Sequence, residues 1–241
     1  MLLAPPTGTV HDHPILGRRV FAEFLGSLLL SAVVVGSGIA AQSLSPNMTG
    51  LELFENAAAT AGGLYVLILM MGPVSGAHFN PIVTIVDAVT GGLRWRDVPW
   101  YVGAQVVGCT SGAFVANLMF SRSAISISTH HRASIAHLFA EVVASAGLIL
   151  VIFTLTRSNR GHLCASAVAT YIGAAYFFTS STSFANPAIA VGRMFSNTFA
   201  GIAPASVPGF IAAELIGAAL GYVAIVTLYP LAPRVLHELE S

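Results

Sequence analysis

Two Asn-Pro pairs are the residues of this chain whose types and spacing could do chemistry. Asn80-Pro81 and Asn186-Pro187 each stand at or inside a long run without a charged residue. Proline is well tolerated in the first turn of a helix, and asparagine is a preferred capping residue just before it. Each pair therefore predicts the start of a short helix, where an asparagine amide and free backbone N–H groups lie at the positive end of the helix dipole.

Such groups are suited to binding the oxygen atoms of neutral solutes rather than to catalysis. The sequence offers no matched nucleophile and base inside its apolar runs and no glycine-rich nucleotide motif, so we predict neither an enzyme nor a bound cofactor. His130, His131 and His137 could suggest a metal site. They share their segment with arginines and many serines, so we predict a solvated outer loop and no metal.

The composition is that of an integral membrane protein. Hydrophobic residues make up 55% of the 241 residues, charged residues only 8%, and the mean hydropathy is +0.79. A soluble domain carries about 25% charged residues, so ten acids and ten arginines cannot solvate this chain. Zero net charge and the absence of a basic run argue against a nucleic-acid partner. The partners expected are the lipid bilayer and small neutral solutes.

The uncharged runs predict how the Asn-Pro pairs are positioned. A helix crosses a bilayer in about 20 residues, and four runs have that length. The runs 56–86 and 161–192 have 31 and 32 residues, too many for one helix and too few for two. Each therefore predicts a full helix, a return loop and a half-helix, at 80–88 and at 186–196. The predicted class is an all-α membrane protein with six transmembrane helices and two re-entrant half-helices.

The two halves of the chain resemble each other. Ala22-Glu23-Phe24 recurs as Ala140-Glu141-Val142, and the segment around Asn80-Pro81 recurs around Asn186-Pro187. Gly103-Ala104-Gln105-Val106-Val107-Gly108 recurs as Ala212-Ala213-Glu214-Leu215-Ile216-Gly217. Three crossings per copy is an odd number, so the second copy enters the membrane upside down, as in inverted-repeat transport proteins.

Arginine placement orients this arrangement. The predicted organisation is a tail at 1–16, a first repeat at 17–128, an inverted second repeat at 129–232 and a tail at 233–241. Seven of the ten arginines fall on the side that carries both tails. Arginine is enriched on the cytoplasmic side of membrane proteins, so we predict a multi-pass protein of the cell (inner) membrane with both termini in the cytoplasm.

The doubled motif resembles the aquaporin or major intrinsic protein family. The resemblance rests on Ser75-Gly76-Ala77-His78-Phe79-Asn80-Pro81 and on Phe184-Ala185-Asn186-Pro187-Ala188, and it covers about residues 17–231. It implies a six-helix bundle with one pore per protomer, homotetramers, and passive flow of water and small uncharged solutes without protons or ions. It also implies that Glu23 and Glu141 support the re-entrant loops and that His78 lines the pore. A pH-sensing gate at His78 is the alternative.

The chain departs from the family pattern near the expected constriction. Ile82 stands where alanine is usual, and Ile189 stands where the family carries an arginine after Asn186-Pro187-Ala188. Arg193 lies four residues further along the half-helix. It is predicted either to serve as a displaced selectivity arginine or to support the end of the half-helix.

Counting from the asparagines places the remaining constriction residues at Thr60, at Gly173 or Ala174, and at Ser183. Because these residues are small, we predict a wide, less polar constriction that passes glycerol-like polyols. Small filter residues with a displaced arginine also resemble bacterial aquaglyceroporin-type members linked to metalloid transport. This resemblance implies neutral metalloids such as arsenite as the other solute class. An ion-coupled secondary transporter is the alternative function, and it would need membrane-embedded carboxylates, for which only Glu23, Glu141 and Glu214 qualify.

Overall fold

The computed structural model describes residues 14–230. The tail predicted at 233–241 lies outside the described residues, and so does the tail predicted at 1–16 except for its last three residues.

Within residues 14–230 the chain is all-helical, which confirms the predicted class. Six helices are crossing helices: α1 (Leu16–Leu44), α2 (Thr49–Ser75), α4 (Val98–Met119), α5 (Ile135–Arg157), α6 (Cys164–Phe178) and α8 (Val207–Leu228). Two are half-helices: α3 (Pro81–Val89) and α7 (Pro187–Arg193). Short 3-10 turns, Trp95–Asp97, Gly161–Leu163 and Pro204–Ser206, precede α4, α6 and α8.

Five of the crossing helices are long and apolar enough to span a membrane by themselves. The exception is α6, which has 15 residues. At about 1.5 Å per residue it rises only about 22 Å, less than the hydrocarbon layer. The loop that follows it, residues 179–186, continues through the interior to the start of α7.

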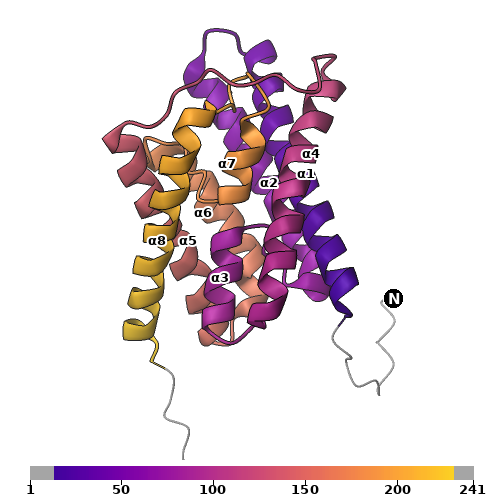
Figure 1. The fold of residues 1–241 in the computed structure, drawn as a ribbon. Coiled ribbons are helices and arrows are strands. Elements are labelled where there is room, and N and C mark those ends of the chain that lie inside the picture. Colours follow the sequence, from indigo (N-terminus) through magenta and orange to yellow (C-terminus); the bar gives the residue numbers. More distant parts are fainter. Residues whose placement is uncertain (1–13, 231–241) are drawn as a thin grey trace, which may run out of the picture.

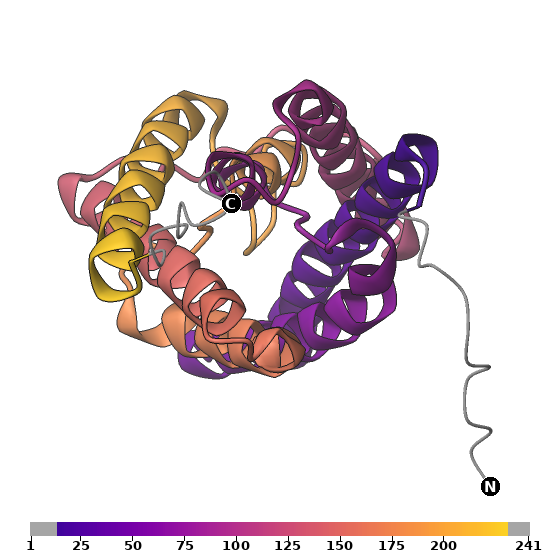
Figure 2. The same cartoon turned by 90° about the horizontal axis from the view of Figure 1, so that it is seen from below.

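The helices form two groups that meet at a central pair of half-helices. α1 packs against α2 and α4, α5 packs against α6 and α8, and α2 and α6 join the groups. Figure 1 shows α3 near the lower end of the molecule and α7 near the upper end, and Figure 2 shows the crossing helices arranged around them. The described chain begins and ends at the lower end, here called the chain-end side; the opposite end is the loop side.

Glycines let the first and last crossing helices of each group approach closely. A Cβ atom at Gly108 would come within 2.5 Å of the Phe24 carbonyl oxygen, and one at Gly221 within 2.8 Å of the Ala146 carbonyl oxygen. Small residues at such contacts are how helices pack in lipid, where apolar burial gives little drive. The close packing of α1 on α4 and of α5 on α8 fixes the frame that holds the half-helices.

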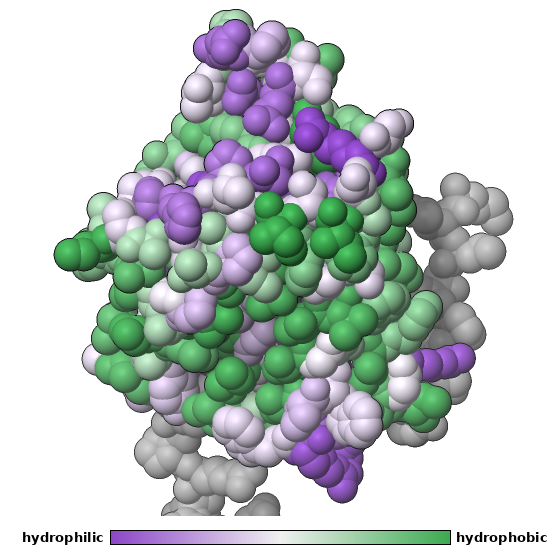
Figure 3. All heavy atoms as spheres, turned by 45° about the horizontal axis from the view of Figure 1, so that its top comes forward, coloured by the Kyte–Doolittle hydropathy of each residue, from purple (hydrophilic) through white to green (hydrophobic). Residues whose placement is uncertain are grey.

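The distribution of polar and apolar side chains on the surface suits a protein that spans a bilayer. Figure 3 shows hydrophobic side chains over much of the flank, while hydrophilic side chains gather at the two ends. Large apolar side chains such as Phe21, Leu69 and Trp100 are more than half exposed, whereas Glu23, Glu141 and Glu214 are fully buried. Buried acids in a membrane protein face the bundle interior and need hydrogen-bond partners there, so they point to the interior site.

Candidate functional site

The two loops that lead into the half-helices share an unusual backbone conformation, with positive φ values at matching positions. Ala77 and Phe79 have φ values of 52° and 50°, and Ser183 and Ala185 have 49° and 45°. These residues lie three positions and one position before the asparagine of each motif. Left-handed backbone is unfavourable for residues with a Cβ atom, so both loops need outside support.

Glu23 supplies that support to the first loop. Its Oε1 accepts hydrogen bonds from the Ser75 hydroxyl at 2.6 Å and from the His78 backbone N–H at 3.0 Å. Its Oε2 accepts from the Phe79 backbone N–H at 2.7 Å and from the Gln105 amide at 2.8 Å. A buried carboxylate with four donors holds the loop in its strained conformation.

The second loop is held by two acids. Glu141 accepts hydrogen bonds from the backbone N–H groups of Phe184, at 2.9 Å, and Ala185, at 2.7 Å. Glu214 accepts from the backbone N–H of Asn186 at 2.9 Å. Neither acid lines the central cavity, and both act on the backbone of the loop. The sequence identified Glu214 only as a membrane-embedded carboxylate that an ion-coupled transporter could use, and not as a partner of this loop.

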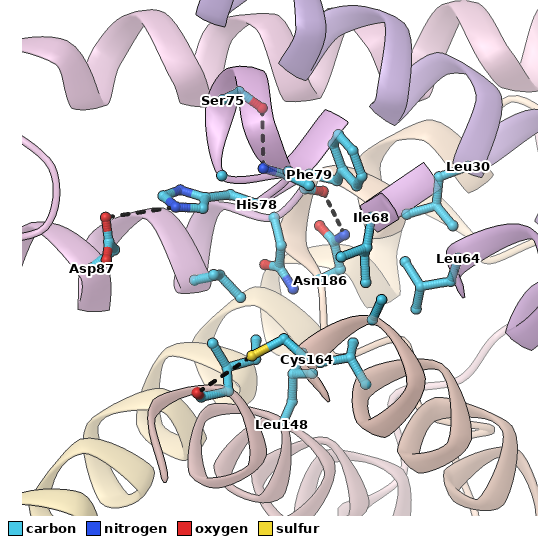
Figure 4. A pocket seen from close by; sticks show the side chains of 18 of the residues that line it. Leu30, Leu64, Ile68, Ser75, His78, Phe79, Asp87, Leu148, Cys164 and Asn186 are labelled. Carbon is cyan, nitrogen blue, oxygen red and sulfur yellow. Dashed lines mark hydrogen bonds and ion pairs between the residues drawn. The ribbon is translucent and has the colours of Figure 1, made fainter. Parts of the chain in front are cut away.

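The two asparagines cap their own half-helices and also join the two repeats. The Oδ1 atom of Asn80 accepts from the Ile82 N–H at 3.1 Å, and that of Asn186 from the Ala188 N–H at 3.0 Å. The Nδ2 atom of Asn186 donates to the Phe79 carbonyl at 2.8 Å (Figure 4). Its counterpart on Asn80 donates to the carbonyl of Ala185 at 2.7 Å. Each amide nitrogen carries two hydrogens, so one remains free to meet a solute.

A cavity of about 1100 Å³ runs past both asparagines. On the chain-end side it is lined by residues such as Arg94, Asp97 and His162. Toward the loop side its lining ends at Thr60, Tyr176 and Arg193. Among the described residues, none in the loops 45–48, 120–134 and 194–206 lines it. Thr60, Tyr176 and Arg193 are therefore the lining residues at the loop-side end of this cavity, the level at which the sequence predicted a constriction.

The structure moves one predicted constriction position along α6. Ala174 is exposed on the outer surface, and Gly173 packs toward Ala61 on α2. The cavity face of α6 is formed by Val168, Ile172 and Tyr176. The prediction of Gly173 or Ala174 is therefore wrong, because it counted back through residues 179–185, whose conformation the sequence does not reveal.

Tyr176 also changes the character of the constriction. Its hydroxyl lies 3.1 Å from the Thr60 hydroxyl on the neighbouring helix α2, and both side chains are buried. The prediction of only small or aliphatic residues at this level is corrected, since a phenol and a hydroxyl stand together there. Ser183, which also lines the cavity, has a buried hydroxyl without a partner among residues 14–230.

Arg193 lines the cavity from the end of α7. Its side chain is 2% exposed, its Nε donates to the Ala200 carbonyl, and its guanidinium carbon lies 3.5 Å from the centre of the Phe184 ring. Within residues 14–230 its two terminal nitrogens have no hydrogen-bond acceptor. Ile189 lines the cavity one turn nearer Asn186.

The half-helix α7 is shorter than the 186–196 predicted from sequence. It ends at Arg193, and the following carbonyls of Met194 and Phe195 accept hydrogen bonds from the backbone of Ser128 and Ser126. This pairing with the loop 120–134 draws the chain away from the helix axis. The first half-helix, Pro81–Val89, lies within one residue of its predicted bounds, and Ile82 is fully buried in it.

A second guanidinium lies on the loop side of Phe184. Arg132 donates to the carbonyls of Gly201 and Phe199, both at 2.9 Å, and its guanidinium carbon is 5.6 Å from the Phe184 ring centre. Burial lowers the pKa of Arg132 from its ordinary value, and the two carbonyls compensate for the lost water. The loop that the sequence predicted as solvated therefore places one partly buried arginine beside the Phe184 ring.

His78 faces the chain-end half of the cavity. Its Nδ1 lies 3.2 Å from the Thr84 hydroxyl and its Nε2 lies 3.6 Å from a carboxylate oxygen of Asp87 (Figure 4). All of these except Thr84 line the cavity. Asp87 was missed in the sequence, although it is the one acid of its half-helix, seven residues after Asn80.

Six crossing helices around two asparagine-capped half-helices define a membrane channel. Residues 11–185 match the family described as Major intrinsic protein. The chain is 48% identical, over 84% of its length and 86% of the other protein, to Aquaglyceroporin AqpS of Rhizobium meliloti (strain 1021). It is 32% identical to Aquaporin NIP6-1 of Arabidopsis thaliana, over 69% of this chain and 52% of that protein. The chain belongs to the major intrinsic protein family.

The fold is also similar to a solved structure. The X-ray structure of the aquaglyceroporin from Plasmodium falciparum matches with a TM-score of 0.67. The match covers 88% of this chain and 95% of that one, at 19% sequence identity. At this identity the likeness establishes the fold alone.

Proposed function

We propose that the protein is a passive channel for water and for small uncharged solutes of the glycerol type. The observation that carries this proposal is the pair Asn80 and Asn186, whose amides face one cavity from the ends of two opposed half-helices. Each offers a free N–H to a passing oxygen atom, while apolar walls such as Leu64 and Ile172 offer nothing to bind. A solute thereby loses part of its hydration shell and hydrogen-bonds in turn to the amide N–H groups that line the pathway.

The half-helices also account for exclusion of cations in this proposal. The N-termini of α3 and α7 point toward the midplane, so their positive dipole ends converge between Asn80 and Asn186. A cation or a hydrated proton meets an unfavourable potential there, while a neutral solute does not.

The solute size limit in this proposal is set by Thr60, Tyr176, Ile189 and Arg193. Arg193 serves as the displaced selectivity arginine, four residues beyond the position where the family usually carries one. Its terminal nitrogens, free of acceptors among the described residues and beside the cavity, support this role over a purely structural one. Its Nε bond to Ala200 and its stacking on Phe184 fix the guanidinium in place.

Nothing supports the ion-coupled alternative. Coupling to Na⁺ or H⁺ needs carboxylates at the midplane of the pathway. Glu23, Glu141 and Glu214 do not line the cavity, and the acids that do, Asp87 and Asp97, lie on the chain-end side. We therefore propose downhill flow, and no enzymatic role.

The test is solute flux into proteoliposomes without any ion gradient, measured by stopped-flow light scattering. Water, glycerol and arsenite are compared in one preparation, because arsenite is the second solute class that the sequence favours. We expect water and glycerol permeability above that of empty vesicles, unchanged by collapsing Na⁺ and H⁺ gradients. Flux that disappears with those gradients would refute passive transport.

We also propose an inner-membrane orientation with both ends of the chain in the cytoplasm. Six arginines of the described part lie on the chain-end side, namely Arg18, Arg19, Arg94, Arg96, Arg157 and Arg160, against Arg122, Arg132 and Arg193 toward the loop side. Within this arrangement the two repeats divide at 128/129 and the channels assemble as homotetramers. Reporter fusions at both termini and native mass spectrometry test orientation and assembly.

A further inference from the structure

The two repeats differ at one buried position beside their half-helices. In the first repeat, the Gln105 amide on α4 donates to Glu23 and to the Thr84 hydroxyl, both at 2.8 Å. The segment around Gln105 matches the segment around Glu214 on α8, so the second repeat has a carboxyl group in place of that amide. An amide donates hydrogen bonds, whereas an ionised carboxylate only accepts them.

One oxygen of Glu214 lacks a donor. The side chain is fully buried, and its Oε1 accepts from the Asn186 backbone N–H at 2.9 Å. Its Oε2 is shielded from solvent and has no hydrogen-bond partner within the described residues. A buried charged oxygen without a donor is strongly unfavourable, and the same oxygen carrying a hydrogen becomes a donor itself.

The neighbouring acceptor is Glu141. Both of its oxygens receive backbone N–H groups, from Phe184 and Ala185, and the Ser181 hydroxyl lies beside it. Glu141 and Glu214 accept hydrogen bonds from three consecutive backbone N–H groups, those of Phe184, Ala185 and Asn186, so the two buried carboxyls lie beside each other. Two buried carboxylates in contact repel each other, and sharing one proton removes the repulsion.

We propose that Glu214 is a neutral carboxylic acid whose Oε2–H donates to the Glu141 carboxylate, so that the second repeat contains a buried proton-binding site. The proton belongs on Glu214, because both oxygens of Glu141 already receive backbone N–H groups. The charged groups that act on this pair of carboxyls are Arg193 on α7 and Arg132 in the loop before α5. α3 also packs against α8, and its one acid, Asp87, is paired with His78.

The bound proton leaves one carboxylate beside each half-helix. Beside α3 there is one carboxylate, Glu23, with the neutral amide of Gln105. Beside α7 there is one carboxylate, Glu141, with the neutral acid Glu214. A second negative charge next to Asn186 would offset the positive end of α7, which is the element that repels cations.

The test is infrared spectroscopy of the full chain in lipid vesicles at about pH 8, where carboxyl groups in contact with water are ionised. We expect the wild-type protein to retain the C=O stretch of a protonated carboxylic acid, shifted in D₂O if the site exchanges. Glu214→Gln should lose this band, because its amide donates in the same place. Gln105→Glu is the matched control in the first repeat and should add a second acid band.

Absence of an acid band in the wild-type protein at this pH would overturn the proposal, as would a band that survives in Glu214→Gln. The first outcome is measured on the unmodified protein, so it stands even where a variant does not fold. A folded Gln105→Glu protein with a single band would refute the claim that this position imposes protonation. Solute flux is not the readout, so failure here is distinguishable from failure of the proposed channel function.

Discussion

In the proposed channel, individual side chains at the constriction set which solutes pass, and neighbouring residues hold each of these side chains. Thr60 and Tyr176 are joined by their hydroxyls, and Arg193 is held by the Ala200 carbonyl and the Phe184 ring. A substitution at this level therefore changes both the opening and the support of an adjacent group. The residue-scale predictions separate these two effects by measuring the ratio of solute permeabilities as well as protein stability.

Thr60→Phe should reduce glycerol flux more than water flux. The phenyl ring of the new residue is larger than the threonine side chain, and it enters the space beside Tyr176, where the cavity lining ends. An added steric barrier of about 1.4 kcal/mol for glycerol lowers its flux about tenfold. Stopped-flow measurement of both solutes on one preparation checks this, and an equal loss of both would mean that Thr60 lies away from the constriction.

Tyr176→Phe removes only the hydroxyl at the same level. The Thr60 hydroxyl loses its partner on α6, so the free energy of unfolding should fall by about 1 kcal/mol. The glycerol-to-water ratio should rise, because one polar atom no longer narrows the opening. Ala174→Ser, on the exposed face of the same helix, is the control and should change neither quantity.

Arg193→Ala should raise glycerol flux relative to water flux if the guanidinium lines the constriction. The change also leaves the Ala200 carbonyl and the face of Phe184 without their partner, so some loss of stability accompanies it. The permeability ratio per folded channel is the decisive measurement. A ratio equal to that of the wild-type protein would assign Arg193 a supporting role only, and Ile189→Arg, which should narrow the pore, checks the alignment.

At the scale of elements, the frame depends on how closely α1 approaches α4 and how closely α5 approaches α8. The half-helices are short, and the loops that lead into them are held by backbone N–H groups that donate to acids on α1, α5 and α8. Helices of this length are marginal by themselves, so their position follows that of the frame. A small increase in the separation of two crossing helices should therefore disturb the loops as well.

Gly112→Ala tests this coupling. The new methyl group would clash with the Leu28 carbonyl oxygen on α1, so we expect destabilisation of about 1–3 kcal/mol. Gly103→Ala in the same helix is the control, since nothing lies within 4 Å of its Cβ position. Thermal unfolding in detergent measures both, and equal melting temperatures would show that α4 can move away from α1 at no cost.

At the scale of the whole molecule, the two repeats are joined across the midplane by the reciprocal bonds of Asn80 and Asn186. Each asparagine caps its own half-helix and donates to a carbonyl of the opposite loop. The dipoles of both half-helices and the orientation of both amides therefore depend on the two repeats docking correctly. The exclusion of cations that we propose is consequently expected to depend on the assembled channel rather than on one motif.

Asn186→Asp should weaken this exclusion. A carboxylate can still cap α7, but it cannot donate to the Phe79 carbonyl, and its charge offsets the positive helix end. We expect measurable proton or Na⁺ current in voltage-clamped membranes, where the wild-type protein gives none. Asn80→Asp is the matched change in the other repeat. If neither variant carries a proton or Na⁺ current, the barrier to cations does not lie at the two asparagines.

The sequence by itself determined the architecture and the motif residues. Charge-free runs of a length set by bilayer thickness predicted the crossings, and Asn-Pro at a helix start predicted both half-helices, because these rules act locally along the chain. The odd number of crossings in each repeat then required the inversion. These inferences need no knowledge of which side chains meet.

Only the tertiary structure decided which side chains meet in the pathway. The residue of α6 at the constriction level is Tyr176 and not Gly173 or Ala174. The sequence could not show this, because the length of chain between α6 and Asn186 does not reveal how the loop folds. Asp87 lies beside His78 because of how the loop before α3 folds, and Arg132 lies beside Phe184 because two distant loops pack together. The sequence also showed Glu214 as one more acid within a membrane helix, and its contact with Glu141 exists only because α5 and α8 pack together around the second half-helix.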